Sequence, residues 1–343
     1  MPGPVTLRDV AAATGVHVST VSRILRGEHD RVRPETVERV VAKASELGYS
    51  ANRWAASLRS GRTGVLGVLV PRITDVVLAT VYEAFEQAAA QRGYMSLVAS
   101  TRDQPEKRSE AVRRFLDQRV DGIVVADARL HDSDLLEIHS AGCPMVLASR
   151  RTADLPYVVS DDAGGGRQAG RHIASSGARR IAIIAGPTYA STAVDRTQGF
   201  LDGLAEGDGS HDVAIVHSGF DLESGQGAMT ELLRRGAPDA VFAVNDFAAV
   251  GAMSALASQG LQPGKDVAVV GYNDIAISER LLVPLTSVRA DLDAMGRTAF
   301  ESICAVIENE PVRNHLVPTQ LVVRSSSEWF GHGPAGGGSD LHD

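Results

Sequence analysis

Residues 5–25 form the stretch VTLRDVAAATGVHVSTVSRIL, which contains the pattern of two short helices joined by a tight turn. Thr6 and Asp9 have the spacing of a capping box. In this motif, the side chain of each residue accepts a hydrogen bond from the backbone N–H of the other at the start of a helix. Apolar residues at helical spacing follow, and they predict a helix that runs to about Thr14. Gly15 then favours the end of this helix.

Two further helices are predicted beyond the glycine. A helix over residues 17–25 is indicated because Val21 and Ile24 share one of its faces. The third helix begins at Pro34, a residue suited to the first turn, and ends before Gly48. Its predicted core stripe consists of Val37, Val40, Val41, Ala44 and Leu47. Three short helices with a glycine turn between the first two are typical of a helix-turn-helix.

The outer face of the second helix is the candidate DNA-reading surface. In a helix-turn-helix, the N-terminal part of the second helix enters the major groove. We therefore expect Val18, Ser19 and Arg23 to touch base edges, while Arg26 and Arg31 contact phosphates. A solvated surface helix would show the same composition, so this pattern alone leaves both interpretations open.

Residues 5–25 closely resemble the operator-reading headpiece of the lactose/galactose repressor family (LacI/GalR), and residues 52–59, NRWAASLR, resemble its hinge helix. The resemblance implies that Leu58 is a wedge in the DNA minor groove and that Ala55 lets two hinge helices approach closely. His17 stands where the family usually has a serine cap, so we expect this helix to begin with a different bond. The residues predicted to contact DNA are Thr6, His17, Val18, Ser19, Thr20, Ser22, Arg23, Arg26, Arg31, Asn52, Ala55 and Leu58.

Charge is distributed unevenly along the 343 residues, which carry 34 Lys and Arg against 42 Asp and Glu. Residues 1–62 hold ten basic and six acidic side chains, whereas the remainder holds 24 basic and 36 acidic. A basic head on an acidic body suits a head that binds a polyanion. The excess over 62 residues is modest, so chance would also explain it.

Other features exclude several classes of protein. No signal peptide and no run of about 18 apolar residues is present, so we expect neither secretion nor membrane binding. Cys143 and Cys304 are far apart in the sequence, which favours the reducing cytoplasm over a disulfide scaffold. Histidine pairs of metal-site spacing and a nucleophile elbow are also absent, so we expect no metal, no cofactor and no catalytic residue.

The fold class of the remainder is predicted to be α/β. From residue 64 onward, apolar strand runs alternate with helical patterns, which favours parallel sheets covered by helices. A second round of this pattern is predicted to begin at Tyr157, giving two halves with a cleft between them. This architecture resembles the periplasmic sugar-binding fold. The family resemblance implies three crossings between the halves, with residues near 290–320 returning to the first half.

One glycine-rich segment allows an enzyme interpretation. Residues 164–169, GGGRQA, match the dinucleotide-binding pattern G-x-G-x-x-G/A. Asp161 and Asp162 precede the glycines, however, and the strand at 181–186 ends without the acid that such a site needs. We therefore interpret this segment as a strand end followed by a glycine-rich helix start that faces the cleft.

Polar side chains at strand ends are predicted to bind a small-molecule effector. By the family resemblance, Asp161 and Arg196 reach the ligand, as do Asn273 and either Asn245 or Asp246. Such side chains bond hydroxyl groups well, and an aromatic side chain can cover an apolar ring face. The predicted effector site consists of Arg72, Thr74, Asp75, Arg150, Asp161, Arg196, Phe220, Asn245, Asp246 and Asn273.

Arg150 leaves two interpretations open. A second arginine in the cleft indicates either an anionic ligand or a salt bridge to Asp161.

Together these observations predict a transcriptional repressor that binds a palindromic double-stranded operator as a homodimer under the control of a sugar-like effector. A solute-binding protein or an enzyme on the same α/β body is the alternative. The predicted domains are a helix-turn-helix headpiece at 1–50, a hinge helix and linker at 51–62, an effector-binding and dimerisation domain at 63–330, and a flexible tail at 331–343.

Overall fold

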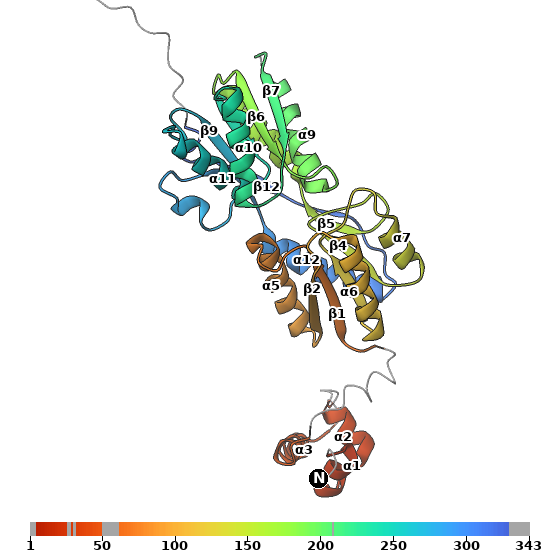
Figure 1. The fold of residues 1–343 in the computed structure, drawn as a ribbon. Helices are drawn as coiled ribbons and strands as arrows, with labels where there is room; N and C mark the ends of the chain where they lie inside the picture. Colours follow the sequence, from red (N-terminus) through yellow and green to blue (C-terminus); the bar gives the residue numbers. More distant parts are fainter. Residues whose placement is uncertain (1–4, 26–28, 30–31, 50–61, 208, 329–343) are drawn as a thin grey trace, which may run out of the picture. The chain divides into compact units, whose positions relative to one another are not determined.

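The computed structural model shows a chain of two compact units, Met1–Thr63 and Gly64–Asp343. We call the first unit the headpiece and the second the body (Figure 1). The described residues are 5–25, 29, 32–49, 62–207 and 209–328. The predicted tail and all but the last residue of the predicted hinge segment, including Asn52, Ala55 and Leu58, lie outside them.

The described part of the headpiece has the three helices expected from the sequence. They are α1 (Leu7–Thr14), α2 (Val18–Ile24) and α3 (Pro34–Glu46). The capping box of α1 forms, because the Asp9 N–H donates to the Thr6 hydroxyl at 3.4 Å and the Thr6 N–H donates to the Asp9 carboxylate at 2.8 Å. Gly15 ends α1 with a φ of 67°, a left-handed conformation that favours glycine.

A small apolar core holds the three helices together, and two residues differ from their predicted places. Val10, Val21 and Val40 are fully buried in this core. Val41 was predicted to share the core stripe but is 48% exposed, because adjacent residues on a helix lie about 100° apart and the core accepts only one of them. Ser22 was expected to face outward but is buried, since α2 packs against both other helices.

The body contains two six-stranded sheets, which define its first and second lobes (Figure 1). The first sheet has the order β11-β5-β4-β3-β1-β2, and all of its pairs are parallel. Its strands are β1 (Val65–Val70), β2 (Met95–Ser100), β3 (Gly122–Val125), β4 (Met145–Ala148), β5 (Tyr157–Ser160) and β11 (His315–Val317). Its helices are α5 (Val76–Gln91), α6 (Pro105–Asp117), α7 (Ser133–Ser140) and α12 (Leu292–Ile307).

The second sheet has the order β12-β10-β9-β8-β6-β7, and only the pair of β12 with β10 is antiparallel. Its strands are β6 (Arg180–Ala185), β7 (Asp212–His217), β8 (Ala240–Ala243), β9 (Ala268–Asn273), β10 (Thr286–Ala290) and β12 (Thr319–Val322). Its helices are α8 (Asp162–Ser175), α9 (Ser191–Ala205), α10 (Leu222–Arg235), α11 (Asp246–Ser258) and the short 3₁₀ turn η1 (Ser278–Arg280). These two sheets confirm the predicted α/β class.

Apolar side chains cover both faces of each sheet. In the first lobe, Phe85 of α5 and Phe300 of α12 pack on one face, and Phe115 of α6 packs on the other. In the second lobe, α8 and α9 cover one face, and α10 and α11 cover the other. Strands buried on both faces explain why their sequences are continuous apolar runs.

Helices α8 and α9 approach each other closely at glycines. A Cβ on Gly166 would lie 2.3 Å from the backbone oxygen of Arg196, and a Cβ on Gly199 would lie 2.1 Å from that of Ala163. Gly166 of the segment 164–169 therefore serves the packing of α8 against α9, and a Cβ on Gly164 or Gly165 would instead meet Asp161 or Tyr272.

The chain crosses between the lobes three times, near Asp161, Asp291 and Pro318. This confirms the three expected crossings and the return of residues near 290–320 to the first lobe. The prediction that the second half begins at Tyr157 is wrong, because β5 pairs with β4 in the first sheet. The apolar sequence of a buried parallel strand does not indicate which of two sheets the strand joins.

Candidate functional site

Helix α2 is the candidate DNA-reading element, and an imidazole caps its start. The Ser19 N–H donates a hydrogen bond to Nδ1 of His17 at 3.3 Å, and the same nitrogen lies 2.8 Å from Ser19 Oγ. His17 thus replaces the expected serine with a different acceptor. A capped first turn holds the N-terminal end of α2 in helical form.

The side chains around this end of α2 differ in exposure. Thr6, Ser19 and Arg23 are exposed, and Val18 and Thr20 are half-buried. Exposed polar side chains on such a helix suit the hydrogen-bonding edges of bases in the major groove.

Of three further predicted DNA contacts, one is buried and two fall outside the described residues. Ser22 belongs to the buried side of α2, so its predicted place on the outer face is wrong. Arg26 and Arg31 lie outside the described residues.

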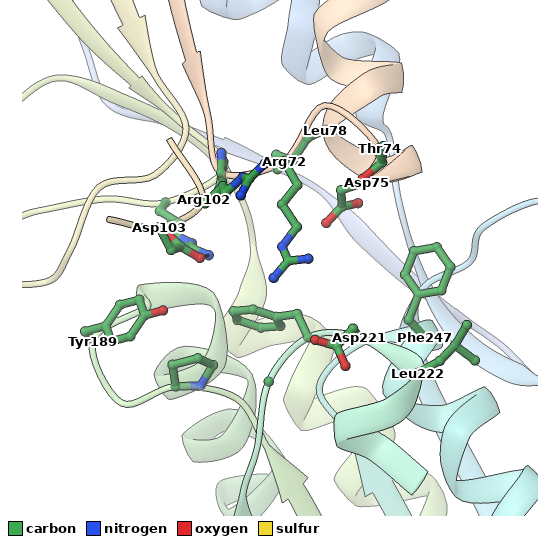
Figure 2. Close-up of a pocket in the computed structure, with 15 residues that line it drawn as sticks. Arg72, Thr74, Asp75, Leu78, Arg102, Asp103, Tyr189, Asp221, Leu222 and Phe247 are labelled. Atoms are coloured by element: carbon green, nitrogen blue, oxygen red, sulfur yellow. Dashed lines mark hydrogen bonds and ion pairs between the residues drawn. The ribbon is translucent and has the colours of Figure 1, made fainter. Parts of the chain in front are cut away.

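A cavity of about 380 Å³ lies between the two lobes of the body, at the carboxyl ends of their strands (Figure 2). Parallel α/β sheets characteristically bind ligands at this edge. A smaller cavity of about 50 Å³ adjoins it and shares Asp75, Leu78, Arg150 and Phe220 with it. We call the two cavities together the cleft.

Most of the predicted effector residues line the cleft. The larger cavity contains Arg72, Thr74, Asp75, Arg150 and Phe220. The smaller cavity adds Arg196, Asn245 and Asn273, together with Thr192. The sequence therefore indicated side chains that the fold does bring together from separate strand ends.

Asp161 and Asp246 are not among the residues that line either cavity. Asp161 caps α8 and accepts a hydrogen bond from the Gly164 N–H at 2.9 Å. Asp246 is 1% exposed and accepts hydrogen bonds from the Ile275 N–H and from the hydroxyls of Ser278 and Ser287. The buried Asp246 carboxylate is fully engaged by protein donors, which gives it a structural role in place of the predicted ligand contact. Asp161 is half-buried, so its contact with a ligand stays a prediction.

Burial affects the acidity of this part of the second lobe. It raises the pKa of Asp246 to about 6, although three hydrogen bonds act in the opposite direction. In the first lobe, burial also raises the pKa of Asp75, which caps α5 and faces Arg150 and Arg196.

Arg196 lines the smaller cavity and is held there by contacts within the second lobe. Its Nε donates to Asp162 at 2.8 Å, and its Nη1 donates to the Val244 carbonyl oxygen at 2.8 Å. Its guanidinium carbon lies 3.8 Å from the centre of the Tyr272 ring, in a cation–π contact. Burial raises the pKa of Asp162 to about 6, while the Arg196 charge acts to lower it.

Arg150 forms a bidentate ion pair with Asp103. The distances are 2.6 Å from Nη1 to Oδ1 and 3.1 Å from Nη2 to Oδ2. The predicted alternative of a salt bridge to Asp161 is therefore wrong. Asp103 follows β2, a strand end that the sequence interpretation had not used.

Sequence reasoning missed further lining residues, namely Arg102, Asp103, Tyr189, Asp221 and Phe247. In Figure 2, Asp103 belongs to the side of the first lobe, whereas Tyr189, Asp221 and Phe247 belong to the side of the second. All of these residues follow the carboxyl end of a strand. The rule that selected Asn245 and Asn273 would have found the first four if it had been applied to β2, β6 and β7, whereas Phe247 lies two residues beyond Asn245, after β8.

The lobes also contact each other directly beside the cleft. Arg151 of the first lobe pairs with Asp195 of α9 at 2.7 Å, and its N–H donates to Ser191 Oγ at 3.0 Å. The Leu130 N–H donates to the Tyr189 carbonyl oxygen at 2.9 Å. These bonds hold the two lobes together at one end of the cleft.

The described residues hold neither a membrane-spanning helix nor a metal cluster. Within residues 5–25, 29, 32–49, 62–207 and 209–328, no helix is long and apolar enough to cross a bilayer. The same part of the chain has no group of three His, Cys, Asp or Glu side chains placed to hold a metal ion.

Comparison with known proteins agrees with this architecture. Residues 6–52 match the family described as bacterial regulatory proteins, lacI family. Residues 63–325 match the periplasmic binding proteins and sugar binding domain of LacI family. The chain belongs to the LacI family. It is a DNA-binding transcriptional regulator and not an enzyme.

Individual relatives of this LacI-family chain extend over nearly its whole length. The HTH-type transcriptional regulator CelR of Thermobifida fusca is 37% identical over 339 residues, which cover 94% of this chain and 98% of CelR. A lac repressor dimer bound to operator and the anti-inducer ONPF is similar with a TM-score of 0.84 and 29% identity, covering 95% of this chain and 99% of that one. A CelR–cellobiose complex is similar with a TM-score of 0.71 and 34% identity, covering 94% and 99%.

Proposed function

We propose that this LacI-family regulator is a repressor that binds a palindromic operator as a homodimer, and that a sugar or sugar derivative in the cleft controls its operator affinity. The main support for this proposal is the cleft between the two lobes. Side chains from both lobes line it, so a bound ligand acts on the arrangement of one lobe relative to the other.

The headpiece supports the DNA-binding part. Helix α2 has a capped start and presents Ser19 and Arg23 on its surface. A dimer would present two such helices to two half-sites related by symmetry. The similar lac repressor structure is a dimer bound to operator.

The chemistry of the cleft supports the ligand class. The Asn273 amide offers both donors and acceptors to hydroxyl groups, and Phe220 offers a ring face. Asn245 also lines the cleft, although its amide caps α11 and donates to the Phe220 carbonyl oxygen. The similar CelR structure is a complex with cellobiose.

The ligand would control operator affinity through a free-energy coupling between the cleft and the DNA-binding site. A ligand that binds one arrangement of the lobes more tightly shifts the population toward it and changes operator affinity, typically by about 1–3 kcal/mol. The hinge segment 51–62 and the dimerisation surface of the body are the proposed carriers of this coupling. Such a regulator acts on chromosomal DNA, and we place it in the cytoplasm.

The test combines DNA selection with ligand screening. The full-length protein selects fragments from a random-sequence DNA pool, and the affinity for the selected fragment is then measured with and without neutral sugars and sugar derivatives. We expect a symmetric selected sequence and a ligand that changes its affinity at least about fivefold. Selection of no preferred sequence would contradict the DNA-binding part, and an affinity that no sugar changes would contradict the ligand class.

A further inference from the structure

The two buried arginines of the cleft are each neutralised by an aspartate of the same lobe. The side chain of Arg150 is 6% exposed and pairs with Asp103. The side chain of Arg196 is 7% exposed and pairs with Asp162, which is 3% exposed. A buried arginine without such a partner would attract an anionic ligand strongly, because little water screens its charge.

The backbone around Asp103 is built to place this carboxylate. Arg102 and Asp103 both have a φ of 57°, a left-handed conformation that costs free energy for residues other than glycine. The Asp103 carbonyl oxygen accepts a hydrogen bond from Arg129 Nη2 at 3.1 Å, which helps to hold the turn. The carboxylate then meets the two terminal nitrogens of Arg150 side by side.

The ion pair with Asp103 compensates the charge of Arg150 but leaves some of its N–H donors free to bond a ligand. A guanidinium has five N–H donors, and Asp103 engages two of them. Asp75 lies in the same cavity and faces Arg150. A ligand hydroxyl can accept from an arginine and donate to a carboxylate, whereas an anion would meet the carboxylates of Asp75 and Asp103.

Two further arginines, Arg72 and Arg102, line the larger cavity without belonging to its buried part. Arg72 and Arg102 are exposed, so water and salt screen their charges. Arg72 also faces Asp221, since its charge helps to lower the pKa of that carboxyl. Their positions leave the buried part of the cleft without net positive charge.

We propose that Asp103 makes the cleft selective for an uncharged polyhydroxylated ligand over a carboxylate or phosphate of the same carbon skeleton. This inference rests on the ligand-controlled function proposed above and resolves the choice that the sequence left open at Arg150. Asp103 acts in two ways, by pairing with Arg150 and as a carboxylate that itself lines the cavity.

The test compares matched pairs of compounds on the wild-type full chain and on Asp103→Asn. Asparagine is nearly isosteric and tolerates the left-handed backbone, so the variant removes the charge with little change of shape. The pairs are glucose with glucuronate, cellobiose with cellobionate, and ribose with ribose phosphate, and calorimetry gives each Kd. In the wild type, we expect the tightest neutral compound to bind at least about tenfold more tightly than its anionic partner, and in Asp103→Asn we expect this ratio to fall at least about tenfold.

The matched control is Asp202→Asn, which removes the carboxylate of a surface pair with Arg167 outside the cleft. This variant should leave the neutral-to-anionic ratio unchanged. The proposal is overturned if an anionic compound binds the wild type as tightly as its neutral partner, if Asp103→Asn leaves the ratio unchanged, or if no neutral compound binds. Operator affinity measured on the same preparations separates these outcomes from a failure of DNA regulation itself.

Discussion

Arg23 lies in the last turn of α2 with its side chain exposed. Arginine is well suited to reading guanine, because its two parallel donors match the two acceptors on the major-groove edge. We expect Arg23→Ala to reduce the preference for the selected operator over random DNA by about 1–3 kcal/mol. Fluorescence anisotropy with both DNA fragments measures this preference.

The control for this substitution is Arg114→Ala in the body, where the arginine side chain is 74% exposed and pairs with Glu110. That variant should retain the full preference. If Arg23→Ala weakens binding to both DNA fragments equally, Arg23 contacts phosphates and does not read bases.

At the scale of single residues, the sequence identified the strand ends that lie near the cleft. It predicted less well the direction in which each side chain points. Asn273 and Asp161 both end strands, yet Asn273 lines the cleft and Asp161 turns back to cap α8. A carboxylate followed by a helix has two possible partners, the ligand and the free N–H groups of the first turn. Spacing along the chain does not distinguish these partners, because the choice depends on how the following helix packs.

At the scale of elements, the contact between α8 and α9 depends on glycine. A Cβ on Gly166 would lie 2.3 Å from the Arg196 backbone oxygen, so alanine there forces the two helices apart. We expect Gly166→Ala to lower the free energy of unfolding by about 1–3 kcal/mol or more, as overpacking does elsewhere. Denaturant unfolding followed by circular dichroism measures it.

Gly227 provides a matched control within helix α10, since nothing lies within 4 Å of the Cβ that alanine would add. Gly227→Ala should stabilise the protein by about 0.5–1 kcal/mol through helix propensity alone. Equal effects at Gly166 and Gly227 would show that the close approach of α8 and α9 does not depend on glycine.

The elements themselves were largely predictable, and their assignment to sheets was not. Strand runs such as 65–70 and 181–185 were recognisable as apolar segments between turn residues. The three-residue strand β11 is too short and too exposed to produce such a run. Its place beside β5 is fixed by the return of the chain through α12, which is a long-range event.

At the scale of the whole body, the contacts between lobes set how readily the cleft opens. Asp195→Asn removes the charge of the Arg151–Asp195 pair, whose side chains are 32% and 21% exposed. Because solvent partly screens the pair, its loss is expected to destabilise the arrangement in which the two lobes are in contact by about 1 kcal/mol. We expect the affinity for a neutral ligand of the cleft to fall by up to about fivefold, as measured by calorimetry.

Asp202→Asn lies on the same helix α9 but pairs with Arg167 within the second lobe. It should leave ligand affinity unchanged. A loss of stability in Asp195→Asn without any loss of ligand affinity would contradict a role of this pair in closing the cleft.

The three crossings between the lobes have a consequence for synthesis on the ribosome. The first sheet is incomplete until β11 at His315–Val317 has been made, and the second is incomplete until β12 at Thr319–Val322. The three described helices of the headpiece, by contrast, end at Glu46, so they can fold while most of the chain is still untranslated. A nascent chain therefore gains a DNA-reading element long before it can gain a cleft. Premature termination would yield a headpiece that no ligand controls.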